Sequence, residues 1–178
     1  VNVSYRQFIG EDLGQSVQRV LEAAGLPGHA LELELTERVL IDDAADTLQV
    51  FDQLRRLGVQ LSIDDFGEGY SALNYLRRLP IHGLKLSPLF VGGVPENRSD
   101  VAVCQAVGGI ARSLGLDLVA EGVERESQRR YLLELGVPVG QGFLFAPGLP
   151  PDEMGRRLAA CGGRSVRQTR LAPGLVGG

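Results

Sequence analysis

The chain has 178 residues, of which 44% are hydrophobic and 22% charged, and its formal net charge is −4. These values are typical of a soluble globular domain, and the length is sufficient for a sizeable core. Without a dense Lys/Arg cluster the acidic chain is a poor partner for a nucleic-acid polymer. No apolar run approaches the roughly 20 residues of a membrane-spanning helix.

The N-terminus and the cysteines bear on whether the chain is a fragment and on its cellular compartment. It begins at Val1, without Met or the pattern of a signal peptide, so we expect a fragment of a longer protein. Cys104 and Cys161 lie in helical patterns without neighbouring His or further Cys. We interpret them as small buried residues of a cytoplasmic protein, which missing upstream segments could tether to a membrane.

The first half of the chain alternates between strand and helix patterns. A short strand at 1–4 precedes a helix with apolar residues at helical spacing from Leu13 to Ala24. Residues 31–36 alternate strictly and predict a strand, and a second helix is expected from about Asp43. Residues 59–64 again alternate, and the strand ends in two adjacent carboxylates, Asp64 and Asp65.

The second half repeats the alternation. We expect a short helix at 71–79, a strand at 84–87, and a helix that Ser99 or Asp100 could cap. A buried strand at 116–123, a helix at 126–135 and a strand at 138–143 follow. Met154, Leu158 and Cys161 indicate a closing helix, and from residue 162 a disordered tail is expected, so the domain is predicted to span 1–161.

Six strands alternating with six helices predict an α/β fold with a parallel sheet. A doubly wound sheet and a barrel both fit this count. The weak glycine loop Gly67-Glu68-Gly69 has no support for dinucleotide binding, so a barrel is favoured. Six strands are fewer than the usual eight of a barrel.

Polar side chains occur where the predicted strands end. In a barrel these ends share one face, and alternation directs the polar residues inward. The expected converging set is Asn2, Glu34, Asp64, Asp65, Lys85, Glu121 and Gln141.

Oxygen ligands of this kind suit a hard divalent cation such as Mg²⁺, Mn²⁺ or Ca²⁺. Lys85 and Glu121 would then orient and deprotonate a water. Each residue also has a simpler interpretation. Asp64 and Asp65 could turn the chain and cap the next helix, Glu34 could be solvated, and Lys85 could pair with Glu121.

These residues belong to six ordered segments by which the chain resembles an EAL domain, the bacterial cyclic-di-GMP phosphodiesterase module. The segments are Val1-Asn2-Val3-Ser4, Glu34-Leu35-Thr36-Glu37, Asp64-Asp65-Phe66-Gly67-x-Gly69-Tyr70-Ser71, Leu84-Lys85-Leu86, Ala120-Glu121-Gly122-Val123-Glu124 and Gln141-Gly142-Phe143. The resemblance implies a TIM-like barrel, here about six of eight strands, that hydrolyses cyclic-di-GMP to pGpG with two Mg²⁺ or Mn²⁺ ions.

The resemblance also implies residue roles. Asn2, Glu34 and Asp64 would be metal ligands, with Asp64 bridging the ions and Asp65 serving the second. Lys85 would hold the attacking water, Glu121 would act as general base or metal partner, and Gln141 would position the water. Glu124 would support the site. Glu37 would anchor the loop of Phe66, Gly67, Gly69, Tyr70 and Ser71, which in the family links the site to dimerisation.

The chain departs from the family pattern in several places. The Glu-x-Leu strand that names the family is absent, and with it a metal-ligand Glu. Ser87 replaces the Asp of the Lys-x-Asp pattern, and Glu68 stands where a small residue is usual. Pro147-Gly148 stands where Arg-Pro is common.

Three interpretations follow from this pattern. The first is a phosphodiesterase that acts as a homodimer within a longer signalling protein with upstream sensory or cyclase domains. The second is a degenerate module that binds cyclic-di-GMP without turnover, and the third is a protein-interaction module.

Overall fold

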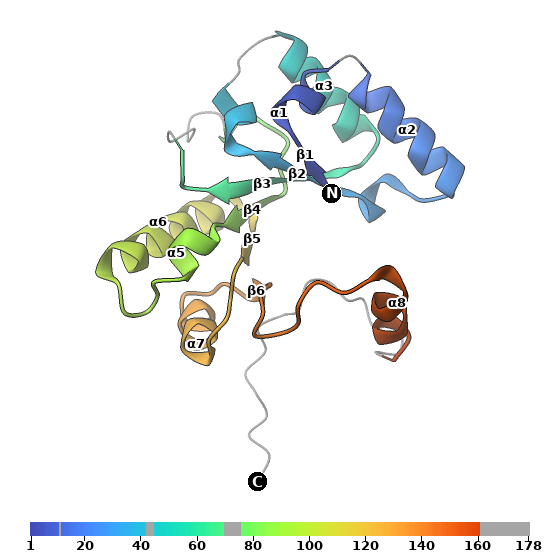
Figure 1. Ribbon diagram of the computed structural model, residues 1–178. Helices are drawn as coiled ribbons and strands as arrows, with labels where there is room; N and C mark the ends of the chain where they lie inside the picture. Colours follow the sequence, from blue (N-terminus) through green and yellow to red (C-terminus); the bar gives the residue numbers. More distant parts are fainter. Residues whose placement is uncertain (11, 42–44, 70–75, 161–178) are drawn as a thin grey trace. The chain divides into compact units, whose positions relative to one another are not determined.

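The computed structural model describes residues 1–10, 12–41, 45–69 and 76–160 (Figure 1). Its six strands are hydrogen-bonded in chain order in one sheet. The pairs β1–β2, β2–β3 and β5–β6 are parallel. The strands are β1 (Asn2–Val3), β2 (Glu32–Thr36), β3 (Gln60–Phe66), β4 (Gly83–Leu86), β5 (Asp117–Ala120) and β6 (Val139–Gly140).

Helices separate these strands along the chain, which confirms the predicted α/β class. The α-helices are α1 (Tyr5–Phe8), α2 (Leu13–Ala24), α3 (Ala45–Arg56), α5 (Pro88–Val91), α6 (Arg98–Leu114), α7 (Glu126–Glu134) and α8 (Pro151–Ala160), and the 3-10 helices are η1 (Gly28–Ala30) and η2 (Glu37–Ile41). The chain divides into two compact units: Val1–Lys85 with Ile110–Asp117, and Leu86–Gly109 with Leu118–Gly178.

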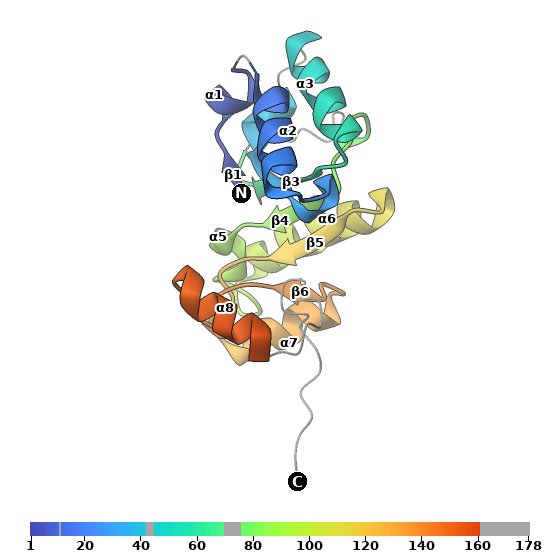
Figure 2. The same ribbon diagram turned by 90° about the vertical axis from the view of Figure 1, so that its right-hand side faces the viewer.

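The core of the first unit lies between β1–β3 and their helices. Leu33, Leu35, Leu61 and Ile63 alternate along β2 and β3 and are buried, as the period of a strand predicts. α2 and α3 lie side by side (Figures 1 and 2). The buried face of α3 contributes Phe51, and its ring packs at 4.8 Å, centroid to centroid, on the ring of Phe8.

The second unit is built around β5, β6 and helices α5, α6 and α7. Val119 is aligned with Val139 and Ala120 with Gly140 in the parallel pair. Cys104 of α6 is fully buried, as predicted, and burial raises the pKa of its thiol to about 11. The other cysteine, Cys161, lies outside the described residues.

Two short helices were not expected from the sequence, and each is explained by its cap. Ser4 and Gln7 form a capping box at α1. Ser87 caps α5, which has Pro88 in its first position, and four-residue helices of this kind have no apolar period to detect.

The expected cap of α6 was wrong, because the capping residue lies two to three residues before Ser99 and Asp100. The helix begins at Arg98, and it is the Asn97 side chain, not Ser99 or Asp100, that accepts a bond from a helix amide, that of Ser99 at 2.9 Å. Asn, Ser and Asp are about equally preferred at a helix N-cap, so residue type alone did not determine where α6 begins.

The closing helix is present as α8, and its apolar residues Met154 and Leu158 are each 42% exposed. Most of the predicted helix at 71–79, and the tail from residue 162, fall outside the described residues. The boundary at residue 161 therefore stays a prediction. In the part of the chain that the structure describes, no helix combines the length and apolarity needed to cross a membrane.

Candidate active site

In the first unit, the ends of three neighbouring strands bring polar side chains together. The register pairs Asn2 with Glu34 and Thr36 with Asp64. Because side chains alternate along a strand, Glu34 and Asp64 both leave the buried leucine and isoleucine face, as the sequence predicted. Both side chains are 19% exposed, so they are mostly withdrawn from water.

Lys85 of β4 provides the positive charge of this group. Its Nζ lies 2.9 Å from Glu34 Oε2 and 3.1 Å from Asp64 Oδ1, and its side chain is 4% exposed. A buried ammonium needs such partners, because an unpaired charge in this environment costs several kcal/mol. Lys85 thus pairs with two of the predicted metal ligands.

Two features of the group suit an additional cation. Asp64 Oδ1 is buried and, among the described residues, makes no hydrogen bond, since its approach to Lys85 has ion-pair distance without hydrogen-bond geometry. The Asn2 amide oxygen faces carboxylate oxygens. Turned over, its nitrogen would instead donate to Glu34 Oε2 at 3.2 Å and Asp64 Oδ2 at 3.3 Å. The first orientation suits a metal between the oxygens, and the second suits the metal-free site.

Asp65 follows Asp64 within β3, but its backbone dihedral departs from ordinary strand geometry. Its φ is 51°, in the left-handed region that few residues other than glycine adopt. This change of direction exposes Asp65 instead of burying it, so strict alternation ends here. Ligand oxygens of the two aspartates still lie within 4.8 Å of each other.

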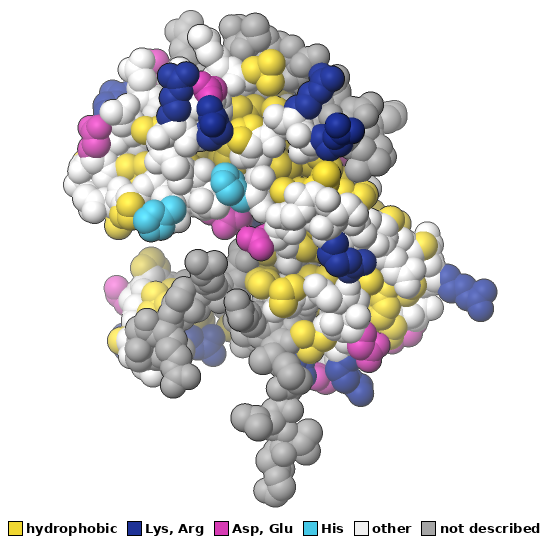
Figure 3. Space-filling model, turned by 180° about the vertical axis from the view of Figure 1, so that it is seen from behind, with side chains coloured by type: hydrophobic (Ala, Val, Ile, Leu, Met, Phe, Trp, Pro, Cys, Tyr) yellow, Lys and Arg dark blue, Asp and Glu magenta, His cyan; other side chains and the backbone are white. Residues whose placement is uncertain are grey.

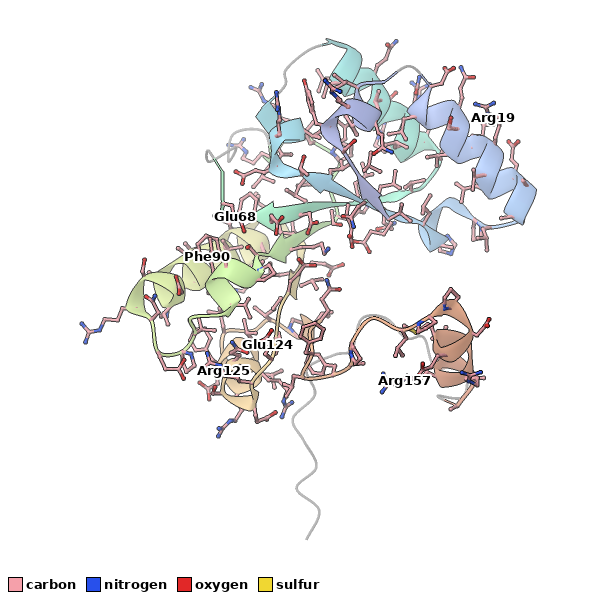
Figure 4. The ribbon with its side chains drawn as sticks, viewed as in Figure 1. Arg19, Glu68, Phe90, Glu124, Arg125 and Arg157 are labelled. Carbon is pink, nitrogen blue, oxygen red and sulfur yellow. The ribbon has the colours of Figure 1, made fainter. Side chains whose placement is uncertain are left out.

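Asp65 shows the electrostatic cost of this arrangement. Partial burial, and then the negative charges of Asp64 and Glu68, raise its pKa above the usual range, and the nearby Lys85 ammonium lowers it in part. Figure 4 labels Glu68 just beyond the end of β3. A cation beside Asp65 would favour its charged form, because opposite charge lowers a carboxyl pKa.

Glu37 binds the loop after β3, as the sequence predicted. Its Oε2 accepts hydrogen bonds from Gly69 N at 3.0 Å and, less closely, from Gly67 N at 3.4 Å. A Cβ at Gly69 would lie 2.9 Å from Glu37 Oε2, so a larger residue there would have to displace the Glu37 carboxylate from this position. Phe66 is buried, whereas Tyr70 and Ser71 lie outside the described residues.

His82 fixes β3 beside the segment that leads into β4, a role that the sequence did not reveal. Its backbone N donates to Leu61 O at 2.8 Å, and its Nδ1 accepts from Leu61 N at 3.1 Å. Both histidine side chains of the chain are visible at the surface in Figure 3. The one signal in the sequence was a histidine next to a strand, and that pattern is too common to predict a contact.

In the second unit, Glu121 and Gln141 are hydrogen-bonded to each other. Gln141 Nε2 donates to Glu121 Oε1, and Val123 N donates to Gln141 O at 3.0 Å. Gly142 allows this approach, because a Cβ there would lie 2.3 Å from both the N and the O of Val123. The structure thus joins these two predicted site residues, and Glu124 follows in the same turn.

Ser87 has a local structural role. It is fully buried, and its Oγ accepts a hydrogen bond from Leu89 N at 3.1 Å as the cap of α5. The family's Lys-x-Asp pattern has an aspartate at this position, and alternation along the predicted strand at 84–87 would place residue 87 on the same face as Lys85. β4 ends at Leu86, so Ser87 follows the strand directly, and its φ of −54° and ψ of 141° keep the backbone extended as it caps α5.

Comparison with known protein families matches residues 1–148 to the family described as EAL domain. The chain therefore belongs to the EAL domain family. It is 45% identical over 138 residues to the cyclic di-GMP phosphodiesterase NbdA of Pseudomonas aeruginosa, covering 78% of this chain and 18% of that protein. It is 40% identical over 154 residues to the bifunctional diguanylate cyclase/cyclic di-GMP phosphodiesterase MucR of the same organism, covering 86% of this chain and 22% of that protein.

Solved structures agree with this assignment. The chain matches the c-di-GMP complex of the PaMucR phosphodiesterase with a TM-score of 0.82 and 40% identity, over 86% of this chain and 62% of that one. It matches the EAL domain of Mycobacterium smegmatis DcpA with a TM-score of 0.84 and 39% identity, over 89% of this chain and 71% of that one. The predicted EAL-type, TIM-like α/β fold is thereby confirmed.

Proposed function

We propose that this chain is part of a metal-dependent phosphodiesterase that hydrolyses cyclic-di-GMP to the linear dinucleotide pGpG. Two relatives carry that activity in their names, although the chain spans only 18% and 22% of their lengths. The observation that carries the proposal is the group in the first unit, where Asn2, Glu34 and Asp64 present oxygens around a buried Lys85 and Asp64 Oδ1 makes no hydrogen bond among the described residues.

The donor set fits the expected cations. Asn2, Glu34 and Asp64 would hold one Mg²⁺ or Mn²⁺ and Asp65 would serve a second, since hard divalent ions prefer oxygen ligands. A divalent cation supplies positive charge that offsets the negative phosphodiester during attack by water. Glu34, Asp64 and Asp65 carry three negative charges against one positive charge on Lys85, so the group as described has net negative charge.

The remaining proposed roles concern the water and its proton. Lys85 can only donate hydrogen bonds, so it would hold the oxygen of the attacking water. Glu121 would accept the proton, and Gln141 would orient the Glu121 carboxylate through the bond that joins them. In the reaction, water oxygen bonds to one phosphorus, one P–O ester bond breaks, and the leaving oxygen takes up a proton.

The test is an assay of the full-length protein. With Mn²⁺, cyclic-di-GMP is expected to become pGpG, detected by chromatography, and EDTA is expected to abolish the product. Asp64→Asn should lower the rate by at least about 100-fold, because one ligand charge is lost. If the wild-type protein bound Mn²⁺ and cyclic-di-GMP without forming pGpG, the proposed phosphodiesterase activity would be rejected.

The second candidate is a receptor that binds cyclic-di-GMP without turnover. The observation that favours it is the raised pKa of Asp65, to which the unusual Glu68 contributes. The third candidate is a protein-interaction module, which would not bind the nucleotide. Calorimetry with cyclic-di-GMP distinguishes it from the receptor, because the receptor would bind the nucleotide without forming product. We include in the phosphodiesterase proposal that the protein is a homodimer, has upstream domains and is cytoplasmic. Light scattering of the full-length protein tests whether it is a dimer.

A further inference from the structure

The side chain of Gln128 lies at the centre of a buried hydrogen-bond group in the second unit. It is 2% exposed, in the first turn of α7. Its Oε1 accepts from Glu124 N and from Arg125 N, both at 2.8 Å. Its Nε2 donates to Val91 O at 3.0 Å and to Gly92 O at 3.4 Å. The amide therefore uses its full capacity of two acceptor and two donor interactions.

Arg125 reinforces the same connection. Its Nη2 donates to Gly92 O at 2.9 Å and to Val94 O at 3.1 Å, and it pairs with the exposed Glu96 at 3.3 Å. Figure 4 labels Glu124 and Arg125 next to each other beside α7. Two side chains thus tie the start of α7 to the end of α5 and the loop that follows.

The segment between β5 and α7, residues 121–125, is held along its whole length. At one end, Glu121 N donates to Leu86 O at 3.1 Å. In the middle, Gly122 has a φ of 66°, and a Cβ there would lie 2.7 Å from Pro88 Cβ. At the other end lie the bonds of Gln128. Only Gly122 and Val123 separate Glu121 from Glu124, so the bonds of Gln128 hold the backbone within three residues of Glu121.

We propose that Gln128 is a positioning residue for Glu121: by binding the amides of Glu124 and Arg125 and the carbonyl groups at the end of α5, it holds the segment 121–125 in the geometry that directs Glu121 to its proton. The inference rests on the proposed function in naming Glu121 as the base. It extends the proposed function, because Glu121, the proposed proton acceptor, would then be positioned by the buried Gln128 amide, which lies outside the substrate contact.

The test compares Gln128→Met with Gln18→Met in the full-length protein. Methionine keeps the approximate shape of glutamine and removes all four interactions. Gln18 is the matched control, because it is an exposed glutamine whose side chain, within the described part of the chain, donates to Glu22 on α2 at 2.8 Å. For Gln128→Met we expect kcat to fall about 10- to 100-fold with KM changed less than about threefold, since misplacement of a catalytic group mainly slows the chemical step.

Hydrogen–deuterium exchange supplies a readout that does not depend on activity. In Gln128→Met the amides of residues 121–125 should exchange at least about tenfold faster, whereas Gln18→Met should leave them unchanged. Gln128→Glu keeps both acceptor interactions and loses both donors. It should therefore retain protection at Glu124 and Arg125 and show an intermediate kcat, and it keeps the test open if the methionine variant does not fold.

Wild-type kcat in Gln128→Met, or unchanged exchange at residues 121–125, would overturn the inference. Faster exchange with wild-type kcat would overturn it as well, because Glu121 would then be placed by other contacts. If the wild-type protein makes no pGpG, the proposed function fails on its own. The exchange comparison then still decides whether Gln128 fixes the segment.

Discussion

Lys85 Nζ lies 2.9 Å from Glu34 Oε2, and the lysine side chain is 4% exposed. The two residues come from strands β4 and β2, and Asp64 of the intervening β3 contacts the same ammonium. One buried cation therefore links three consecutive strands at the position where the metal ligands are expected. Removing the lysine would leave two mostly buried carboxylates without their positive partner, which is the costly change for a buried ion pair.

Replacing Lys85 with Met should destabilise the protein strongly. The substitution leaves Glu34 and Asp64 mostly buried without their positive partner, which costs about 3–5 kcal/mol in the free energy of unfolding. Urea unfolding in EDTA measures this loss. Mn²⁺ should restore part of it by replacing the missing positive charge.

Arg56→Ala is the control for this experiment. Arg56 pairs with Asp52 at 2.6 Å, but its side chain is 76% exposed, so removing it should cost less than about 1 kcal/mol. Equal effects of the two substitutions would show that the Lys85 pairs are no stronger than surface ion pairs.

Asp65→Asn should stabilise the metal-free protein at neutral pH. The pKa of Asp65 is raised in the folded state, chiefly by burial and then by Asp64 and Glu68, so ionisation of this carboxyl favours unfolding. The advantage of the Asn variant should be complete above the raised folded pKa. It should disappear as the pH falls below 3.8, the ordinary pKa of an aspartate, because Asp65 is then protonated in both states.

The measurement is urea unfolding of both proteins in EDTA across this pH range. Asn suits the site because, like Asp, it tolerates the left-handed φ of 51° found there. Asp12→Asn is the matched control, at another left-handed residue with φ 80°, the N-cap of α2. An Asp65→Asn advantage that persists at low pH would contradict the electrostatic cause.

That Glu34 and Asp64 share a face, and that Glu121 meets Gln141, could be predicted, whereas the local backbone and caps at the strand ends could not. Period two placed Glu34 correctly because β2 is a regular strand with alternating buried leucines. The same rule could not foresee the capping of α5 by Ser87 or the left-handed φ at Asp65. The role of Gln128 depends on Val91, which is 37 residues away, and no local pattern reports such a contact.

Ser87→Ala should lower the free energy of unfolding by about 1 kcal/mol, the usual cost of losing a helix cap. The serine Oγ accepts from Leu89 N, so alanine leaves that amide without its acceptor. Ser87→Asp should keep the cap, because aspartate is an equally favoured capping residue. Thermal unfolding measures both effects.

The same variants test the departure from the Lys-x-Asp pattern. If residue 87 acts as a cap, Ser87→Asp should leave the affinity for Mn²⁺ within about twofold of the wild type, because a carboxylate bound to the α5 amide contributes little to a metal site. A gain of about tenfold or more, measured by calorimetry, would show that the missing carboxylate is a ligand.

Gly142→Ala should uncouple Gln141 from Glu121. The new Cβ would lie 2.3 Å from the N and the O of Val123, so the chain after β6 must move away from β5. We expect a loss of about 1–3 kcal/mol in stability from the forced shift, and a fall in kcat of at least about tenfold as the Gln141–Glu121 bond is broken.

Gly148→Ala is the control, because nothing lies within 4 Å of a Cβ at that position. It should change stability by less than about 0.5 kcal/mol. Unfolding in urea and the rate of pGpG formation are measured for both variants. If Gly142→Ala retained both stability and rate, the approach of Gln141 to Glu121 would not depend on the glycine, and the proposed orientation of the Glu121 carboxylate by Gln141 would lose its structural support.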